Sequence, residues 1–485
     1  MELNDQFLVS AGARPHPDGW LVAQAGRWTL ASSPTLPVTP LLDEHGATAG
    51  WLLGWVVAPD GEFLHQRPTL PLGEVVAPDG DVEERLYRFA GRWACVLLSG
   101  RPRVHLDPAG SLAAVYSEQE EAVASTTTVL HHGDRALGER FGRRTLPPGQ
   151  FFPAGLTNEP KVHRVLPNHL LDLETWQTRR HWPPAPVERV DDRDTEAVAD
   201  RQRAIADGVR LTIESIAAHH RVLLPLTAGR DSRLLAAAAH RVLDRCTFVV
   251  FAYDDQRASD LAFARGAARR FDLDLRVLPP EPVDERAART YLDRVGYDAN
   301  EGKAGDFMLA AGRLPLDHAW LTGFAAEVGR GEYWKASDLP RNPSADELVQ
   351  LVRLRPEPAY RDALETWRAG TPHQDVEELL DLAYLEMRVG CWASPQLYGA
   401  APFTLSTIPV NRRDVFSAML QLPTALRAAQ RTAPAATALN WPELARLPYG
   451  RAPGLRGAPD ALARGAQRVR DGAALGTRLR RALRR

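Results

Sequence analysis

The spacing of apolar residues changes near residue 190, and this change limits the folds open to the chain. Between residues 20 and 128, short apolar runs alternate with turn residues; the runs 92–98 and 103–106, on either side of a Ser-Gly-Arg-Pro turn, predict a hairpin. From Asp194 to His220 apolar side chains recur at helical spacing, and strand-like and helix-like segments then alternate, with a strand predicted over 246–251 and a helix over 259–271. The pattern predicts a first half dominated by strands, followed by a doubly wound parallel sheet with helices on both faces.

We expect two domains, because a proline- and tryptophan-rich stretch separates the two patterns. Successive prolines oppose helices and central strands alike. We therefore interpret residues 156–190 as a linker between a domain over 1–155 and a domain over 191–463. With 485 residues, 44% of them hydrophobic, the chain is long enough for two cores. The arginine-rich tail, 464–485, fits a solvated helix or an arm for nucleic acid or an acidic partner, and both readings stay open.

The charge balance and the cysteine content exclude several classes of protein. The chain has 59 basic and 61 acidic residues, and this balance speaks against a general nucleic-acid or membrane coat. Cys95, Cys246 and Cys391 are too few and too scattered for a disulfide framework or a zinc site. The sequence lacks a signal-peptide pattern and an apolar run of about 18 residues. We expect a cytoplasmic protein without membrane contact.

One strand–turn–helix unit is the most informative segment. A buried strand over 221–226 leads into the turn 227–232, and an alanine-rich helix follows. Small residues let the backbone approach an anion, and the helix N-terminus supplies unpaired N–H groups and the positive end of its dipole. Thr227 and Ser232 add hydroxyl donors, and Asp231 can ligate magnesium. The turn predicts a phosphate site, although an ordinary helix cap by Asp231 or Ser232 would suit the same residues.

These residues resemble a known family. Residues 226–232 resemble the Ser-Gly-Gly-x-Asp-Ser loop of the ATP-pyrophosphatase superfamily, in the form used by asparagine synthetase and β-lactam synthetase. Residues 247–278 are similar to that family's second βα unit, and residues 321–333 to its Gly-Glu-Gly-x-Asp-Glu-x-x-x-Gly-Tyr segment. Residues 89–94 and 106–111 resemble the glutaminase-like sandwich that precedes it. The resemblance implies an N-terminal antiparallel β-sandwich of the N-terminal-nucleophile-hydrolase type. It also implies a C-terminal doubly wound parallel sheet with added helices, of the adenine nucleotide alpha-hydrolase type.

The resemblance implies ATP- and magnesium-dependent amide-bond formation. A small-molecule or peptide carboxylate is adenylated, pyrophosphate leaves, and an amine displaces AMP, as in β-lactam synthetase or the lasso-peptide macrocyclases of natural-product biosynthesis. A glutaminase of this type needs a cysteine at residue 1 after Met removal. Here Glu2 follows Met1, so we expect no glutamine hydrolysis and a non-catalytic first domain. A homodimer or a pathway protein as partner stays open.

The resemblance also assigns site residues. The expected magnesium ligands are Asp231 and Glu327. The expected nucleotide-binding residues are Leu226, Thr227, Ala228, Gly229, Arg230, Asp231, Ser232, Arg233, Phe251 and Gly323.

Four residues are candidates for catalysis, each with a structural alternative. The family uses a late lysine, but no lysine follows Lys335, so Arg451 is the expected replacement unless it is a surface arginine. Arg330 acts at the site or only pairs with a neighbouring carboxylate. Tyr384 and Glu386 are a candidate amine-activating pair, although residues two apart face different sides of a helix.

Phe324 stands where β-lactam synthetase carries a catalytic tyrosine and asparagine synthetase a glutamate. Neither substrate assignment therefore carries over. Phe324 and the altered loop motivate a second hypothesis, a pseudoenzyme that binds nucleotide or a partner without turnover. A third, RNA modification, is performed by other enzymes with this loop, and the near-neutral charge disfavours it.

Overall fold

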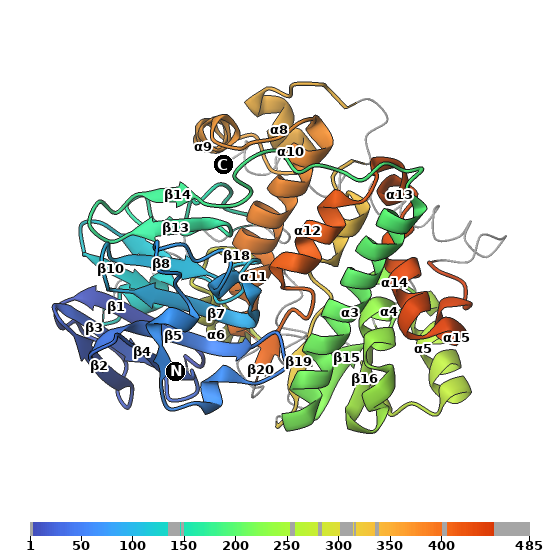
Figure 1. Ribbon diagram of the computed structural model, residues 1–485, viewed down its shortest axis with the longest axis horizontal. Coiled ribbons are helices and arrows are strands. Elements are labelled where there is room, and N and C mark those ends of the chain that lie inside the picture. The colour runs from blue at the N-terminus through green and yellow to red at the C-terminus, as the bar shows by residue number, and fades with distance from the viewer. Residues whose placement is uncertain are drawn as a thin grey trace, which may run out of the picture.

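A computed structural model describes residues 3–133, 146, 150–252, 258–279, 284–300, 314, 317–334, 339–399 and 405–450. Arg451 and the tail 464–485 lie outside the described residues. The chain forms a β-rich N-terminal half and a C-terminal half in which helices surround a parallel sheet (Figure 1). The expected mixed α/β class, with antiparallel and parallel sheets, is therefore confirmed.

Two sheets pack face to face in the N-terminal half. Their order is β12-β9-β10-β1-β3-β2 and β14-β13-β8-β7-β5-β4-β6. All pairings are antiparallel except β4 with β6. The strands are β1 (Phe7–Ala11), β2 (Leu21–Ala25), β3 (Trp28–Ser32), β4 (Val38–Leu42), β5 (Thr48–Val57), β6 (Leu70–Pro71), β7 (Ala90–Leu97), β8 (Arg103–Leu106), β9 (Val115–Ser117), β10 (Ala122–Ala124), β12 (His163–Arg164), β13 (His169–Asp172) and β14 (Thr178–Arg180).

Alternation along the strands builds the core between these sheets. Phe7 and Val9 of β1 meet Val104 and Leu106 of β8 in one buried cluster. Successive strand residues point to opposite faces, so every second residue enters the core. The hairpin predicted from the sequence is present as β7 and β8, with Ala94 opposite Leu106.

The linker expected over 156–190 is corrected for much of its length. The strand β12 pairs with β9 of the first sheet, whereas β13 pairs with β8 and β14 in the second. Leu171 and Trp176 are buried in the sandwich core. Backbone pairing and apolar burial make this segment a part of the sandwich. The sequence predicted a linker because the segment contains several prolines.

The C-terminal half contains a five-stranded parallel sheet in the order β17-β16-β15-β19-β20. Its strands are β15 (Val222–Pro225), β16 (Cys246–Phe251), β17 (Leu275–Leu278), β19 (Ala319–Leu321) and β20 (Leu405–Thr407). One face packs against α3 (Thr195–His219), α4 (Arg230–Ala238) and α5 (Ala258–Phe271). The strand over 246–251 and the helices near 194–220 and 259–271 agree with the sequence predictions to within a residue.

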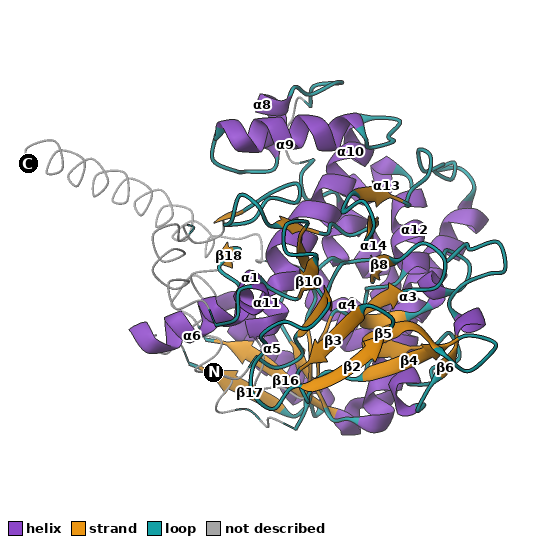
Figure 2. Ribbon diagram, turned by 90° about the vertical axis from the view of Figure 1, so that its left-hand side faces the viewer, coloured by secondary structure: helices purple, strands orange, loops and turns teal. Residues whose placement is uncertain are grey.

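Further helices follow β19. They are α8 (Ala345–Leu351), α9 (Pro358–Ala369), α10 (Val376–Ala383), α11 (Ser394–Gly399), α12 (Arg413–Gln421), α13 (Thr424–Ala428), α14 (Thr432–Asn440) and α15 (Pro442–Ala445). The helices α8 and α9 lie together at one edge of the molecule (Figures 1 and 2). Other elements are α1 (Thr127–Leu130), α6 (Glu285–Val295), the 3-10 turns η1 (Leu64–Gln66), η2 (Leu72–Glu74), η3 (Leu86–Arg88), η4 (His240–Arg245) and η6 (Ala326–Arg330), and the pair β11 (Gln150–Phe151) and β18 (Ala299–Asn300).

A ten-residue π-helix, η7 (Tyr384–Ala393), continues α10 directly and runs into α11. π-helices are rare and frequently mark functional sites. Gly390 lies where a side chain would collide with the sandwich: a Cβ built there would be 2.4 Å from Pro167 Cδ. A glycine at this position therefore lets the π-helix pack closely against the N-terminal half.

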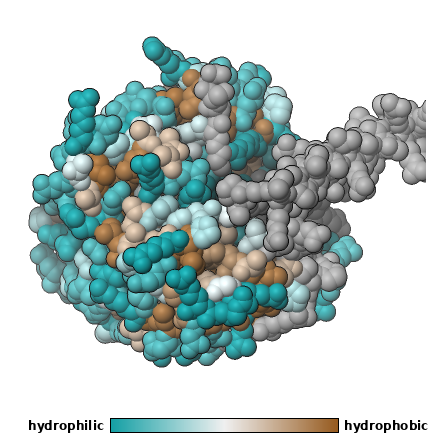
Figure 3. All heavy atoms as spheres, turned by 90° about the vertical axis from the view of Figure 1, so that its right-hand side faces the viewer, coloured by the Kyte–Doolittle hydropathy of each residue, from teal (hydrophilic) through white to brown (hydrophobic). Residues whose placement is uncertain are grey.

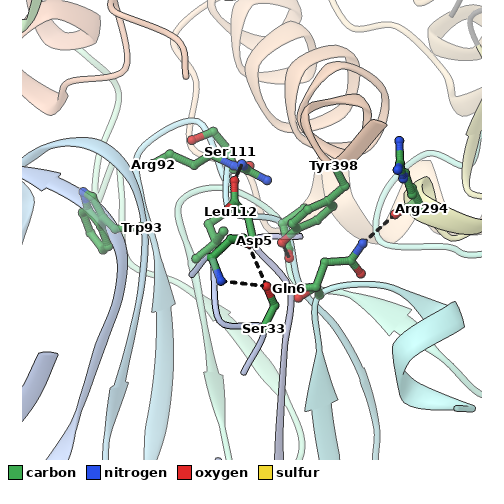
Figure 4. Close-up of polar contacts among 12 residues, drawn as sticks. Asp5, Gln6, Ser33, Arg92, Trp93, Ser111, Leu112, Arg294 and Tyr398 are labelled. Atoms are coloured by element: carbon green, nitrogen blue, oxygen red, sulfur yellow. Dashed lines mark hydrogen bonds and ion pairs between the residues drawn. The ribbon is translucent and has the colours of Figure 1, made fainter. Parts of the chain in front are cut away.

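Buried polar contacts join the two halves. Gln6 donates to the carbonyl oxygen of Arg294 on α6 over 3.0 Å (Figure 4). The guanidinium carbon of Arg92 lies 4.7 Å from the ring centre of Tyr398 on α11. Asn411 donates over 2.6 Å to Asp107 Oδ1. The two halves thus share a polar, buried boundary.

Polar residues predominate on the face of the molecule drawn in Figure 3. Apolar residues form small separate patches on this face. None of the helices in the described ranges combines the length and the apolar composition needed to cross a bilayer.

Candidate active site

Strand order brings two loops together at the edge of the parallel sheet. The chain leaves β15 toward β16 on one side, while β19 pairs with β15 on the other. The strand order therefore reverses at β15. In open α/β sheets, ligands bind beyond the carboxyl ends of the strands at the point where the strand order reverses. The loops after β15 and β19 meet there, since a Cβ built on Gly323 would lie 3.4 Å from the Cβ of Asp231.

The turn after β15 is organised by its own side chains. Thr227 and Ser232 join their hydroxyl groups over 2.7 Å, and Gly229 N–H donates to Thr227 Oγ1 over 3.1 Å. Ala228 N–H donates to Asp260 Oδ1 over 3.0 Å. The helix α4 starts after Gly229, and no side chain caps it. Its first N–H groups therefore remain available to an anion.

Three of the residues expected to bind nucleotide contact other parts of the protein or lie in its core. Leu226 is fully buried and belongs to the core below the sheet edge. Arg233 is also fully buried: it donates to the carbonyl oxygens of Leu447 and Pro448 and stacks on Tyr449, 3.9 Å from the ring centre. This contact fixes the end of the described chain against the loop. Phe251 is half-buried at the end of β16.

A charge cluster fills the meeting point of the two loops. Arg330 Nη2 lies 3.0 Å from Asp231 Oδ2 and 3.5 Å from Glu327 Oε1. Arg330 Nη1 lies 2.6 Å from Glu332 Oε2. The four side chains are only 16–21% exposed, so their charges interact with little screening. The structure thus brings Asp231, Glu327 and Arg330 together, as the sequence predicted.

Like charges at close range shift the titration of this cluster. Burial raises the pKa of Glu327 above its ordinary value; the negative charge of Asp231 adds to the shift and Arg330 opposes it. Burial likewise raises the pKa of Asp231, against the pull of Arg330. Burial opposes the charged form of Arg330, but Asp231 and Glu327 outweigh it and raise the pKa of this arginine. The site strongly favours a cation between the two carboxylates.

Asp231 and Glu327 also suit a magnesium ion. Asp231 Oδ1 and Glu327 Oε2 are buried and have no hydrogen-bond partner within the described ranges. Magnesium is held by one or two carboxylates together with the phosphates of a substrate. The described residues contain no group of three or more His, Cys, Asp or Glu side chains that could hold a metal by itself. The pair therefore fits an ion that arrives with nucleotide phosphates.

A cavity of about 390 Å³ borders Glu327, Arg330 and Glu332. Tyr384, Arg388 and Trp392, spaced four residues apart on the π-helix, form part of its wall. The other lining residues are Gln150, Phe151, Phe324, Tyr333, Val352, Arg353 and Ala393.

The cavity wall combines aromatic rings with polar donors. The guanidinium carbon of Arg388 lies 3.4 Å from the Trp392 ring centre, and Phe324 meets the same ring edge-on at 5.7 Å. Tyr333 Oη and Trp392 Nε1 are buried without a partner in the described part of the chain. A ligand in this cavity would meet flat apolar surfaces and unused hydrogen-bonding groups.

Tyr384 and Glu386 face different surroundings. The Tyr384 hydroxyl hydrogen-bonds Glu327, and burial raises the pKa of this tyrosine well above its ordinary value, so it stays protonated and donates. Glu386 is fully buried elsewhere: Arg180 contacts both its oxygens, and Trp367 Nε1 donates to it over 2.6 Å. The expected Tyr–Glu pair is thus not assembled, and Glu386 instead ties β14 to the π-helix.

Arg230 opens α4 and lies 5.9 Å from the Tyr449 ring, close to the loop as expected. Arg451 follows Gly450, whose N–H donates to the Ala228 carbonyl oxygen over 2.9 Å, but Arg451 itself lies outside the described residues. Sequence reasoning missed Tyr333, Arg388 and Trp392. The four-residue spacing on the π-helix was the one signal for two of them.

Comparison with protein-family models gives no match, and no curated protein matches the sequence.

Proposed function

We propose that this chain is an ATP- and magnesium-dependent carbon–nitrogen ligase that adenylates a substrate carboxylate and transfers the acyl group to an amine. The observation that carries the proposal is that Asp231 and Glu327 lie close together beyond the carboxyl ends of β15 and β19. The N-terminus of α4, which no side chain caps, and the cavity of about 390 Å³ lie beside them. Asp231 comes from the phosphate loop after β15 and Glu327 from the segment after β19, so two separate segments supply the carboxylates.

The loop residues would bind the phosphates. The N-terminus of α4 and the hydroxyl groups of Thr227 and Ser232 offer donors to the departing pyrophosphate. Asp231 and Glu327 would hold the magnesium ion, which neutralises pyrophosphate charge when bound. The Tyr384 hydroxyl orients Glu327 through its hydrogen bond.

The cavity would hold the carboxylate substrate. In the first step a carboxylate oxygen bonds to the α-phosphorus as the bond to pyrophosphate breaks. In the second step the amine nitrogen bonds to the acyl carbon, AMP leaves, and the amine loses a proton. Phe324 and Trp392 bring an apolar wall to this cavity, so a substrate with an apolar portion fits it better than a fully polar one.

Pyrophosphate exchange into ATP tests the proposal with a panel of amino acids, peptides and aryl or alkyl carboxylates. We expect exchange with at least one acid, and a loss of about 100-fold or more in Asp231→Asn, because the variant loses one of the two carboxylates that would hold the magnesium ion. The control is Asp207→Asn, which changes an exposed carboxylate on α3. Background exchange with every acid, or unchanged exchange in Asp231→Asn, contradicts the proposal.

A second candidate is a nucleotide- or partner-binding pseudoenzyme of the same fold. The specific observation is Arg330, whose guanidinium already contacts both candidate metal ligands. Calorimetry distinguishes the candidates: the ligase should bind ATP far more tightly with magnesium than with a chelator. Equal ATP affinity in both conditions, without AMP formation, favours the pseudoenzyme.

A further inference from the structure

A second cavity lies in the N-terminal half, on the outer face of the seven-stranded sheet. Its volume is about 960 Å³, and β8, β13 and β14 contribute to its wall together with the segment 72–85. Val104 and Leu106 of β8 point into the sandwich core. Alternation therefore places Arg103 and His105 on the opposite face, where both line the cavity.

Positive charge dominates this cavity. Its charged lining consists of Arg85, Arg101, Arg103, Arg179 and Arg180 against Asp81 and Glu83. The carboxylates are already engaged: Glu83 contacts His181 Nδ1 at 2.5 Å, and Asp81 accepts the backbone N–H of Glu83 over 3.0 Å.

Three lining arginines, Arg85, Arg103 and Arg179, form no ion pair within the described ranges; Arg85 donates to the carbonyl oxygens of Gly73 and Val76. Arg101 pairs with Asp172, and Arg180 pairs with Glu386. Arg103 donates over 3.2 Å to the carbonyl oxygens of Arg101 and Gly80. Burial lowers the pKa of Arg103, and the nearby charge of Arg179 lowers it further. An anion between the two guanidinium groups would relieve this repulsion.

His105 adds a buried polar group to the same wall. It is 1% exposed, and its Nδ1 lies 3.3 Å from the Tyr87 hydroxyl. Its Nε2 is buried and has no hydrogen-bond partner among the described residues. Burial and the neighbouring His181, Arg103 and Arg179 hold the pKa of His105 well below its ordinary value, so the ring is neutral. The one hydroxyl proton of Tyr87 serves the Leu106 carbonyl oxygen or His181 Nε2, which lie 3.1 Å and 2.8 Å from the hydroxyl oxygen. The hydroxyl oxygen therefore accepts from His105 Nδ1–H, and the unprotonated Nε2 of His105 can accept a hydrogen bond from a ligand.

We propose that this cavity binds a small molecule through an oxyanion, a carboxylate or phosphate group, held by Arg103 and Arg179, while His105 Nε2 accepts a hydrogen bond from a hydroxyl group of the same molecule. Guanidinium groups recognise both oxyanions through paired N–H donors. The rest of the cavity accommodates the body of the ligand. This site is separate from the candidate active site and does not depend on the proposed ligase reaction.

Calorimetric titration of the full chain at low chloride concentration tests the proposal, with inorganic phosphate and malonate as separate probes. We expect Arg103→Gln and Arg179→Gln each to weaken binding about tenfold or more, because each removes a charge-assisted contact. The matched control is Arg101→Gln, an arginine of the same cavity that already pairs with Asp172; its affinity should stay within about twofold of the wild type. The probe that binds more tightly identifies the group.

Arg179 is an exposed strand residue, so its variant keeps the test informative if Arg103→Gln fails to fold. Phosphate bound at the loop 226–232 would be unaffected by either variant. Undetectable binding of both probes at millimolar concentration, or unchanged affinity in both variants, overturns the proposal. Absence of pyrophosphate exchange would refute the ligase and leave this site untouched.

Discussion

Replacing Arg330 with methionine tests the charge arrangement of the candidate active site. The guanidinium is the cation that contacts Asp231, Glu327 and Glu332, whereas methionine keeps much of the side-chain volume without charge or donors. The three carboxylates would then repel one another at close range. We expect a less stable protein whose stability recovers when a divalent cation is supplied.

The burial of the charge cluster determines how much stability Arg330→Met loses. Removing one partner of a fully buried ion pair costs about 3–5 kcal/mol, and exposed pairs contribute about 0–1 kcal/mol. Arg330 is 21% exposed, which places the loss at about 2–4 kcal/mol. A cooperative unit of roughly 260 residues has an unfolding entropy of about 0.5 kcal/mol/K. The melting temperature should therefore fall by about 4–8 °C.

Thermal unfolding with chelator and with about 10 mM magnesium measures both effects. An ion bound in the variant with a dissociation constant near 0.1 mM would return about 2.7 kcal/mol, so magnesium should raise the melting temperature of Arg330→Met much more than that of the wild type. The control is Arg67→Met, which removes an arginine that contacts Glu62 and Glu74 on the surface. A variant as stable as the wild type in chelator, or an equal magnesium effect in both proteins, refutes the reasoning.

Two further substitutions test the packing of the π-helix. Gly390→Ala should destabilise by about 1–3 kcal/mol in chemical denaturation, because its Cβ would overlap Pro167, whereas Gly266→Ala in α5 meets nothing within 4 Å and should be neutral or stabilising. Glu386→Gln should cost about 3–5 kcal/mol at pH 7 by leaving Arg180 unpaired. Burial opposes the ionised form of Glu386, but Arg180 outweighs it and holds its pKa below the ordinary 4.5. The stability that ionised Glu386 contributes is present above pH 4.5 and is lost as the pH falls through its folded-state pKa. The free energies of unfolding of the wild type and the variant should therefore converge in acid.

Helices and strands could be predicted from the sequence where the spacing of apolar residues fits only one of the two. The strand 246–251 is a continuous apolar run, as expected for a buried parallel strand, and the structure contains it with the same bounds. The strands of 163–180 were missed because they are two to four residues long and lie next to prolines. Their pairing partners, β8 and β9, lie dozens of residues earlier, and local pattern carries no information on such pairing.

The candidate site was predictable only as far as its motifs extend. The loop at 227–232 and the acidic residue Glu327 carry recognisable patterns, and strand order brings them together. The partner of Glu386 is Arg180, 206 residues away, and nothing in either local sequence indicates this contact. The buried environments of Tyr333 and Trp392 likewise depend on tertiary packing. Chemistry could be inferred from the sequence, but the choice between catalytic and structural roles required the fold.

Arg330 makes magnesium dependence the property that separates the two candidate functions. A guanidinium and a magnesium ion both neutralise Asp231 and Glu327, and Arg330 already lies 3.0 Å and 3.5 Å from their oxygens. In a ligase the arginine must share the carboxylates with the incoming ion. Asp231 Oδ1 and Glu327 Oε2 permit this, because neither has a hydrogen-bond partner among the residues that the structure describes. In a pseudoenzyme the arginine suffices, and ATP binding loses its need for a metal. Magnesium should then leave the ATP affinity of the wild type unchanged while it tightens ATP binding to Arg330→Met, whereas a ligase should show tightening in both proteins.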